Sequence, residues 1–388
     1  MRIGIDTAVL SNDPTSSGGR VTRLVMSAFE RIADDGLVAL HPTGALEATG
    51  RVEVVASQLA ERFRPLGRVG GLHWAQLGLL SQARHQKVDL LHCVYHEVPL
   101  LAPPRLKISS MIHDLCGLRA DCGYRRLGRA HFHHYWRLWT ASKRSDGFLF
   151  VSNSTRRAFC DRFPYTVSRP AVDSLWFTEP TPTRSTSVHR AGFSQALQEP
   201  FFTGFAYPGR RKGVDLFARA FRGYVERGGR SRLILMLSGL SQPEAAEYFV
   251  DSLRHVTFLE AVNDSERDTL IAASRGLVFP SRCEGFGLPL IEALALGVWP
   301  IAFTNTPAEE ILARPDKLAR WGDTDELALR MLEADSEFAS ESTIEAEAAR
   351  AMALERFSFF NRERFNASVE ELVRQLTPPS EIRTASST

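Results

Sequence analysis

Hydrophobic residues along the chain form short continuous runs that alternate with longer amphipathic stretches. The runs at 2–9, 88–94, 107–113 and 147–152 are nearly all apolar, as strands buried on both faces of a parallel sheet are. After the first run, apolar residues recur at the spacing of one buried helix face, namely Val21, Leu24, Val25, Ala28, Phe29 and Ile32. Strands that alternate with helices predict a doubly wound α/β sheet.

The alternation stops in a stretch rich in Pro, Ser and Thr, and then restarts. In the second half we expect strands at 201–206, 232–237, 256–259, 276–280 and 298–303, with helices at 214–227, 243–253, 264–274 and 289–296. Two such runs on either side of a linker predict two α/β domains that face one cleft. Ligands of these folds bind at the carboxyl ends of the strands.

These patterns divide the chain into five expected segments. We expect an N-terminal Rossmann-like domain at 1–175, a linker at 176–200 and a C-terminal domain at 201–360. A helix at 361–376 is expected to pack back towards the N-terminal domain, and 377–388 reads as a disordered tail.

Composition excludes several classes of protein. The 388 residues are 44% hydrophobic and 24% charged with a net charge of +2, which is typical of a globular chain and not of a disordered one. The five cysteines are odd in number and form no Cys-x-x-Cys pair, so we expect reduced thiols, as in a cytosol. No apolar run is long enough to span a bilayer, and the first residues lack a signal peptide's pattern. We therefore expect a cytoplasmic protein.

Charge is distributed unevenly along the chain. Residues 1–200 hold 25 Lys or Arg against 17 Asp or Glu, and the densest basic stretch, 119–144, is interleaved with aromatic residues. This stretch reads either as a solvated helix face or as a surface attracted to anionic phospholipid at the inner face of the membrane. No nucleic-acid-binding motif accompanies it. His131, His133 and His134 lack the spacing of a zinc site and are interpreted as the polar face of this helix.

The segment 279–292, FPSRCEGFGLPLIE, carries the clearest chemistry. A strand runs into a turn with two glycines, and Pro289 then suits the first position of a helix. Backbone N–H groups at that helix start can bind an anion. Glu284 in the turn and Glu292 on the helix can each accept hydrogen bonds from vicinal hydroxyls of a sugar or ribose.

The stretch EGFGLPLIEALALG, with seven residues between its two glutamates, resembles the signature of glycosyltransferase family four. Three further segments are similar to family segments in the same order: MIHDL at 111–115, FLFVSNSTRRAF at 148–159 and YPGRRKGVDLFARAF at 207–221. Members of this family are retaining glycosyltransferases of the GT-B fold. The resemblance therefore implies two Rossmann-like domains, an acceptor domain at 1–175 and a nucleotide-sugar donor-binding domain at 201–360, with a donor linked to GDP or UDP.

The resemblance also implies roles for residues of the second domain. Glu284 would contact hydroxyls of the donor sugar, and Glu292 would hold the ribose. Lys212, with Arg211 beside it, would bind the diphosphate, so that no metal ion or other cofactor is required. The backbone presented to the sugar and diphosphate would come from Phe286, Gly287 and Leu288.

In the first domain, His113 would lie near the reacting centre, and Gly18 and Gly19 would occupy a loop that closes on the donor. His113, Glu284 and Lys212 are thus the candidate catalytic residues. Many family members carry an Arg where this chain has Phe205, and either Arg210 or Arg211 can substitute for it.

These observations lead to one functional hypothesis. The protein is expected to transfer a hexose, with mannose favoured, to a hydroxyl of a glycan or lipid-linked glycan in surface polysaccharide or lipopolysaccharide synthesis. Two alternatives stay open at this point. One is a GT-B sugar-nucleotide epimerase or hydrolase that uses water as acceptor, and the other is a catalytically inactive GT-B binding module.

Overall fold

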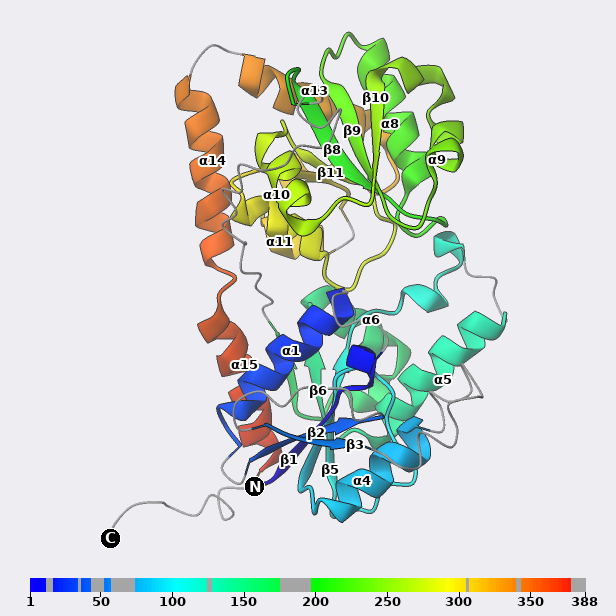
Figure 1. The fold of residues 1–388 in the computed structure, drawn as a ribbon, viewed down its shortest axis with the longest axis vertical. Helices are drawn as coiled ribbons and strands as arrows, with labels where there is room; N and C mark the ends of the chain where they lie inside the picture. Colours follow the sequence, from blue (N-terminus) through cyan, green and yellow to red (C-terminus); the bar gives the residue numbers. More distant parts are fainter. Residues whose placement is uncertain are drawn as a thin grey trace. The chain divides into compact units, whose positions relative to one another are not determined.

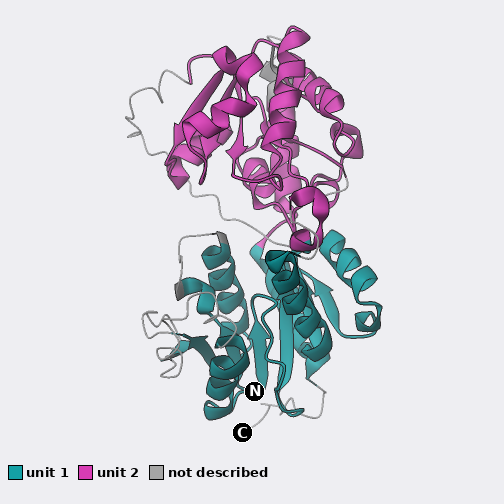
Figure 2. Cartoon of the chain, turned by 90° about the vertical axis from the view of Figure 1, so that its right-hand side faces the viewer, with its two compact units in different colours: residues 1–115, 127–175, 362–388 teal, residues 116–126, 176–361 magenta. Residues whose placement is uncertain are grey.

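The computed structural model describes residues 1–11, 17–33, 36–42, 52–56, 74–123, 128–174, 197–304, 307–339 and 343–377 (Figure 1). The chain divides into two compact units, shown in teal and magenta in Figure 2. Unit 1 comprises Met1–Leu115, Leu127–Leu175 and Arg362–Thr388, and unit 2 comprises Cys116–Arg126 and Trp176–Asn361. Residues 176–196 of the expected linker (176–200) and residues 378–388 of the expected tail (377–388) lie outside the described residues.

Unit 1 is built on a seven-stranded sheet in the order β3-β2-β1-β4-β5-β6-β7, in which every pair is parallel. Its strands are β1 (Ile3–Asp6), β2 (Leu37–His41), β3 (Val52–Ala56), β4 (Leu90–Cys93), β5 (Lys107–Ile112), β6 (Gly147–Phe150) and β7 (Ala171–Asp173). All residues of β1, β2, β4 and β6 are buried, as their apolar runs indicate.

Helices cover this sheet and include the last helix of the chain. They are α1 (Ser17–Glu30), α4 (Leu79–His85), α5 (Arg129–Arg144), α6 (Asn153–Arg162) and α15 (Arg362–Leu376), with short helical turns at Ala8–Ser11, Trp74–Gly78 and Pro164–Thr166. Helix α15 packs on α1, β6 and β7, and it buries Phe365, Val369 and Leu372 at helical spacing. The chain therefore returns to unit 1 after completing unit 2.

Unit 2 is built on a five-stranded parallel sheet in the order β10-β9-β8-β11-β12. Its strands are β8 (Phe201–Ala206), β9 (Arg232–Leu237), β10 (Val256–Glu260), β11 (Leu277–Phe279) and β12 (Pro300–Ala302). Its helices are α8 (Val214–Glu226), α9 (Gln242–Tyr248), α10 (Asp264–Ala273), α11 (Leu288–Ala295), α12 (Ala308–Leu312), α13 (Thr324–Ala339) and α14 (Thr343–Ser358). Short turns lie at Cys116–Leu118, Ala120–Cys122, Val250–His255 and Pro315–Lys317.

Helix α8 shows how the unit 2 core holds the sheet. Val214, Phe217, Phe221 and Tyr224 recur at helical spacing and are almost fully buried against β8, β9 and α13. The Tyr224 hydroxyl donates to the Asp335 carboxylate at 2.6 Å and accepts from the backbone N–H of Ser231 at 2.8 Å, so its burial leaves no polar atom unpaired. The packing fixes the start of α8, and with it the loop that leads into the helix.

Two doubly wound parallel sheets confirm the predicted fold class. No helix among the described residues is long and apolar enough to cross a bilayer.

Candidate active site

The candidate site of unit 2 lies where the order of strands reverses. Strands β8 and β11 are neighbours in the sheet, but β9 follows β8 on one side and β12 follows β11 on the other. Loops that leave two such strands diverge from a crevice at the carboxyl edge, where open α/β sheets bind their ligands. The loop after β8 carries Arg211 and Lys212, and the loop after β11 carries Glu284.

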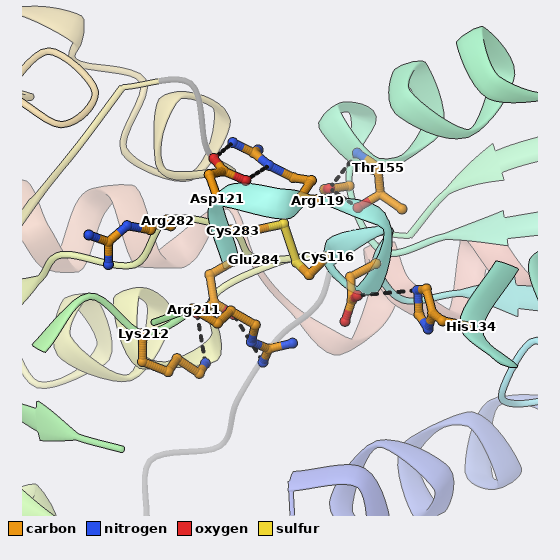
Figure 3. The surroundings of a disulfide bond; sticks show 12 residues. Cys116, Arg119, Asp121, His134, Thr155, Arg211, Lys212, Arg282, Cys283 and Glu284 are labelled. Atoms are coloured by element: carbon orange, nitrogen blue, oxygen red, sulfur yellow. Dashed lines mark hydrogen bonds and ion pairs between the residues drawn. A yellow bond between two sulfur atoms is a disulfide. The ribbon is translucent and has the colours of Figure 1, made fainter. Parts of the chain in front are cut away.

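The structure brings these three side chains together. The Lys212 Nζ donates to Glu284 Oε1 at 2.7 Å, and an Arg211 guanidinium nitrogen lies 4.0 Å from Glu284 Oε2 (Figure 3). The Glu284 side chain is only 8% exposed, so these two cations are close partners of a carboxylate largely withdrawn from solvent. Of the two arginines left open by the sequence, Arg211 faces Glu284, whereas the side chain of Arg210 is exposed.

Glycine permits the close approach of the two loops. Gly213 adopts a left-handed conformation with φ of +71°, and a Cβ at this position would collide with the carbonyl oxygen of Pro280. Gly213 therefore allows the Arg211–Lys212 turn to lie directly against the chain leaving β11. No larger residue satisfies both requirements.

Helix α11 begins beside Glu284. Gly287 caps it in a left-handed conformation with φ of +96°, Leu288 is its first residue and Pro289 follows. The helix start thus carries a partial positive charge, as the sequence predicts. Phe286 is buried and packs edge-on against Phe360, which holds the turn in place. Glu292, one turn further along α11, is 7% exposed.

Two residues of this neighbourhood were missed by the sequence analysis. Burial raises the pKa of Tyr207, and the nearby carboxylates of Glu284 and Glu292 raise it further, so the Tyr207 ring lies within the field of both. Arg267 on α10 interacts electrostatically with Glu292. Tyr207 stands at the start of the segment that resembles the family's diphosphate loop, which was the one available signal.

In unit 1, His113 follows β5 directly. Its Nε2 lies 2.7 Å from the carbonyl oxygen of Val94, and its ring stacks on Tyr95 with centroids 4.3 Å apart. Burial lowers the pKa of His113, which favours the neutral ring at pH 7. Because a carbonyl only accepts hydrogen bonds, Nε2 carries the proton, and Nδ1 is left as an acceptor.

Gly18 and Gly19 lie in the first turn of α1, which differs from the loop that the sequence suggested. A Cβ on Gly18 would collide with the Tyr95 hydroxyl. Gly18 therefore allows α1 to approach the Tyr95 ring that supports His113. The preceding residues, 12–16, lie outside the described part of the chain.

The expectation that all five cysteines are reduced is wrong. Cys116 and Cys283 form a disulfide with their Cα atoms 5.7 Å apart, while Cys93, Cys122 and Cys160 are free (Figure 3). The two partners are 167 residues apart, so no sequence spacing reveals the pair. The bond ties the Cys116–Arg126 segment of unit 2 to the residue directly before Glu284.

The histidines of α5 do not form a metal site. His134 lies 3.8 Å from the carboxylate of Asp114 and packs edge-on against His96. Within the described ranges, no group of three or more His, Cys, Asp or Glu side chains is arranged to hold a metal ion.

Part of the chain is similar to known glycosyltransferases. Residues 200–334 match the family model described as glycosyl transferases group 1. The matched residues all lie in unit 2. This segment includes Lys212, Glu284 and Glu292, whereas Gly18, Gly19 and His113 lie outside it.

One curated relative is the O-antigen chain mannosyltransferase B of Escherichia coli, with 33% identity over 78 residues. The match spans a fifth of each chain. Among solved structures, sucrose-phosphate synthase from Thermosynechococcus elongatus superimposes with a TM-score of 0.68 at 17% identity, covering 97% of this chain and 99% of the other. WaaG, a glycosyltransferase involved in lipopolysaccharide biosynthesis, gives a TM-score of 0.66 at 13% identity over 96% and 100% of the two chains. These similarities identify the fold as GT-B.

Proposed function

We propose that this protein is a retaining GT-B glycosyltransferase that moves a hexose from a nucleotide-sugar to a hydroxyl group of a glycan or lipid-linked glycan. One observation carries the proposal. The segment that matches group 1 glycosyltransferases places Lys212 and Arg211 around Glu284, at the switch point of a parallel sheet and beside the start of α11.

The donor would be bound by groups with complementary chemistry. Lys212, Arg211 and the N–H groups at the start of α11 would neutralise the diphosphate, whose charge grows as the glycosidic bond breaks. Glu284 would accept hydrogen bonds from sugar hydroxyls, and Glu292 from the ribose. Lys212 also pairs with Glu284, so the diphosphate would be a second anionic partner of this cation.

The reaction requires no nucleophile from the enzyme. The acceptor oxygen would form a bond to the anomeric carbon while the bond from that carbon to the phosphate oxygen breaks, and the acceptor proton would pass to the leaving phosphate. The positive groups around the diphosphate stabilise this leaving group, so we propose that catalysis is independent of a metal ion. A role for His113 near the reacting centre stays a prediction.

The relatives suggest the class of donor and acceptor. One is a mannosyltransferase that acts on O-antigen chains, and another is involved in lipopolysaccharide biosynthesis. We propose GDP-mannose as the donor and a lipid-linked glycan of the cell surface as the acceptor.

A turnover assay tests the proposal. Purified protein is incubated with GDP-mannose or UDP-hexoses, with and without a lipid-linked oligosaccharide acceptor, and both nucleotide release and the elongated glycan are measured. Lys212→Met and Glu284→Gln should each lower kcat/KM by about 10²- to 10³-fold, the scale for one preorganised electrostatic contact. The control Arg222→Ala, on α8, removes exposed ion pairs to Asp251 and Glu226 and should leave activity unchanged. Turnover without acceptor would instead support a hydrolase or epimerase.

We also propose that unit 1 contacts an anionic membrane through α5. Arg129, Phe132, Trp136, Trp139 and Lys143 recur every three or four residues along this helix, which contains no acidic residue. Phe132 is 64% exposed, and Tyr165, beneath the Lys143 ammonium, is 44% exposed. An aromatic stripe with basic ends suits the interface of an anionic bilayer.

Vesicle sedimentation tests this contact. Binding to vesicles containing phosphatidylglycerol should exceed binding to pure phosphatidylcholine and should fall with salt. Phe132→Ser combined with Lys143→Glu should abolish it. Val250→Ser, which changes a residue of unit 2 that is 70% exposed, should have no effect. Equal binding of the two variants would refute the α5 surface.

A further inference from the structure

Arg282 stands out because its charge is almost fully withdrawn from solvent. The residue is 5% exposed and follows β11 by three positions, two residues before Glu284. Its guanidinium donates to both carboxylate oxygens of Asp215 at 2.6 Å, in the two-pronged geometry typical of strong Arg–carboxylate pairs. It is therefore engaged within the protein and is not available to grip a diphosphate.

The other contacts of Arg282 are to the loop that carries the candidate diphosphate ligands. Its Nη1 donates to the carbonyl oxygen of Arg210 at 2.7 Å, and its backbone N–H donates to the carbonyl oxygen of Arg211 at 2.8 Å. Asp215 lies in the first turn of α8, directly after this loop. One residue thus joins the loop after β11 to both ends of the turn that presents Arg211 and Lys212.

We propose that Arg282 is the positioning residue of the donor site, fixing the Arg211–Lys212 turn against Glu284 while touching no substrate itself. This inference rests on the proposed function. In this proposal Arg211 and Lys212 bind the diphosphate, whereas Arg282 holds the turn that presents them. Only a planar guanidinium can serve a carbonyl and both oxygens of a carboxylate together, so lysine cannot replace it.

The geometry explains why such a support is required. The Lys212 Nζ must meet Glu284 Oε1 at 2.7 Å, and the two residues belong to loops 72 positions apart in sequence. A misplacement of about 1 Å at a catalytic group can cost on the order of 100-fold in rate. The hydrogen bonds of Arg282 hold the backbone of both loops near the Lys212–Glu284 contact, which limits such a misplacement.

Three variants test the proposal. Arg282→Gln removes the positive charge and the two parallel hydrogen bonds to Asp215. Arg282→Lys keeps the charge but not the planar guanidinium. Asp215→Asn keeps the shape of the Asp215 side chain but removes its negative charge. Each should lower kcat/KM for the nucleotide-sugar by about 10- to 100-fold. Arg222→Ala on α8 serves as the matched control, because the ion pairs it breaks, to Asp251 and Glu226, are both exposed.

A double-mutant cycle separates positioning from general stability. If Arg282 acts through Lys212, then Arg282→Gln in the Lys212→Met background should change kcat/KM by less than about threefold. An equal loss in both backgrounds would overturn the proposal, because a merely structural role would be additive. Arg282→Lys and Asp215→Asn repeat the cycle if Arg282→Gln fails to fold.

Hydrogen–deuterium exchange gives a readout that does not depend on activity. Residues 207–213 should exchange faster in Arg282→Lys than in the wild type, and at the wild-type rate in Arg222→Ala. Unchanged hydrogen exchange in Arg282→Lys would overturn the proposal that Arg282 fixes this turn, even if activity falls. If the wild type binds no nucleoside diphosphate but residues 207–213 still exchange faster in Arg282→Lys, the proposed function fails, while the role of Arg282 in holding the two loops together stands.

Discussion

The disulfide between Cys116 and Cys283 makes the most specific prediction about stability. Cys116 is fully buried and Cys283 is 8% exposed, so the bond lies inside unit 2. We expect Cys116→Ala, or reduction of the wild type, to destabilise the protein, because the bond no longer limits the freedom of the unfolded chain.

The magnitude follows from the length of the closed loop. With a separation of 167 residues, the chain-entropy relation gives about 5 kcal/mol at 25 °C. For a slope of about 2.5 kcal/mol per molar urea, this corresponds to a fall of about 2 M in the unfolding midpoint. Residual structure in the unfolded chain acts to reduce this value.

We expect no exchange between the free thiol of Cys122 and the disulfide at neutral pH. Cys122 packs against both disulfide partners, and burial together with the nearby Asp121 raises its pKa to about 11. A protonated thiol is a poor nucleophile, so Cys122 leaves the disulfide intact.

The assay is urea unfolding of protein purified without reductant, repeated after reduction. Cys160→Ala, which removes a free thiol on α6, is the control and should keep the wild-type midpoint in both states. Titration with a thiol reagent in denaturant should find three free thiols per chain before reduction and five afterwards. Five thiols before reduction, or equal midpoints for the oxidised and reduced wild type, would refute the reasoning.

Two further predictions concern single residues. Burial lowers the pKa of His92 to about 3, so the folded protein holds this ring neutral while the unfolded chain protonates it below about pH 6.5. The free energy of unfolding therefore keeps the full contribution of His92 above pH 6.5, and it decreases as the pH falls below that value, by about 2 kcal/mol at pH 5. Urea unfolding at pH 7 and pH 5 should therefore show a smaller loss for His92→Gln than for the wild type, and an equal loss would contradict this account. Gly213→Ala should lower kcat/KM at least as much as Lys212→Met, because its Cβ forces the diphosphate loop away from Pro280, whereas Gly209→Ala, which meets no neighbour, should cost less in activity.

Hydrophobic patterning was sufficient to predict much of unit 2. Strands Phe201–Ala206 and Arg232–Leu237 appear with the expected bounds, because continuous apolar runs bounded by turns are the signal of buried parallel strands. Strands β2 and β3 of unit 1 were not anticipated. They are short, and a run of four or five residues seldom distinguishes a strand from a piece of helix.

The site was predictable only as far as local motifs extend. The Gly-rich turn and the start of α11 follow from residues 284–289, and Lys212 and Glu284 do meet. The disulfide and the hydrogen bonds of Arg282 join positions many residues apart in sequence. They can be recognised only in the structure, where the order of strands brings the loops after β8 and β11 together.

The central claim is that Lys212, Arg211 and the start of α11 form a diphosphate site. Calorimetric titration with GDP, UDP and ADP, first with a chelator and then with magnesium, tests it directly. We predict saturable binding of one nucleotide without metal, favouring GDP, and a large loss of that binding in Lys212→Met but not in Arg222→Ala. The absence of binding by all three nucleotides, or full binding by Lys212→Met, would contradict the account.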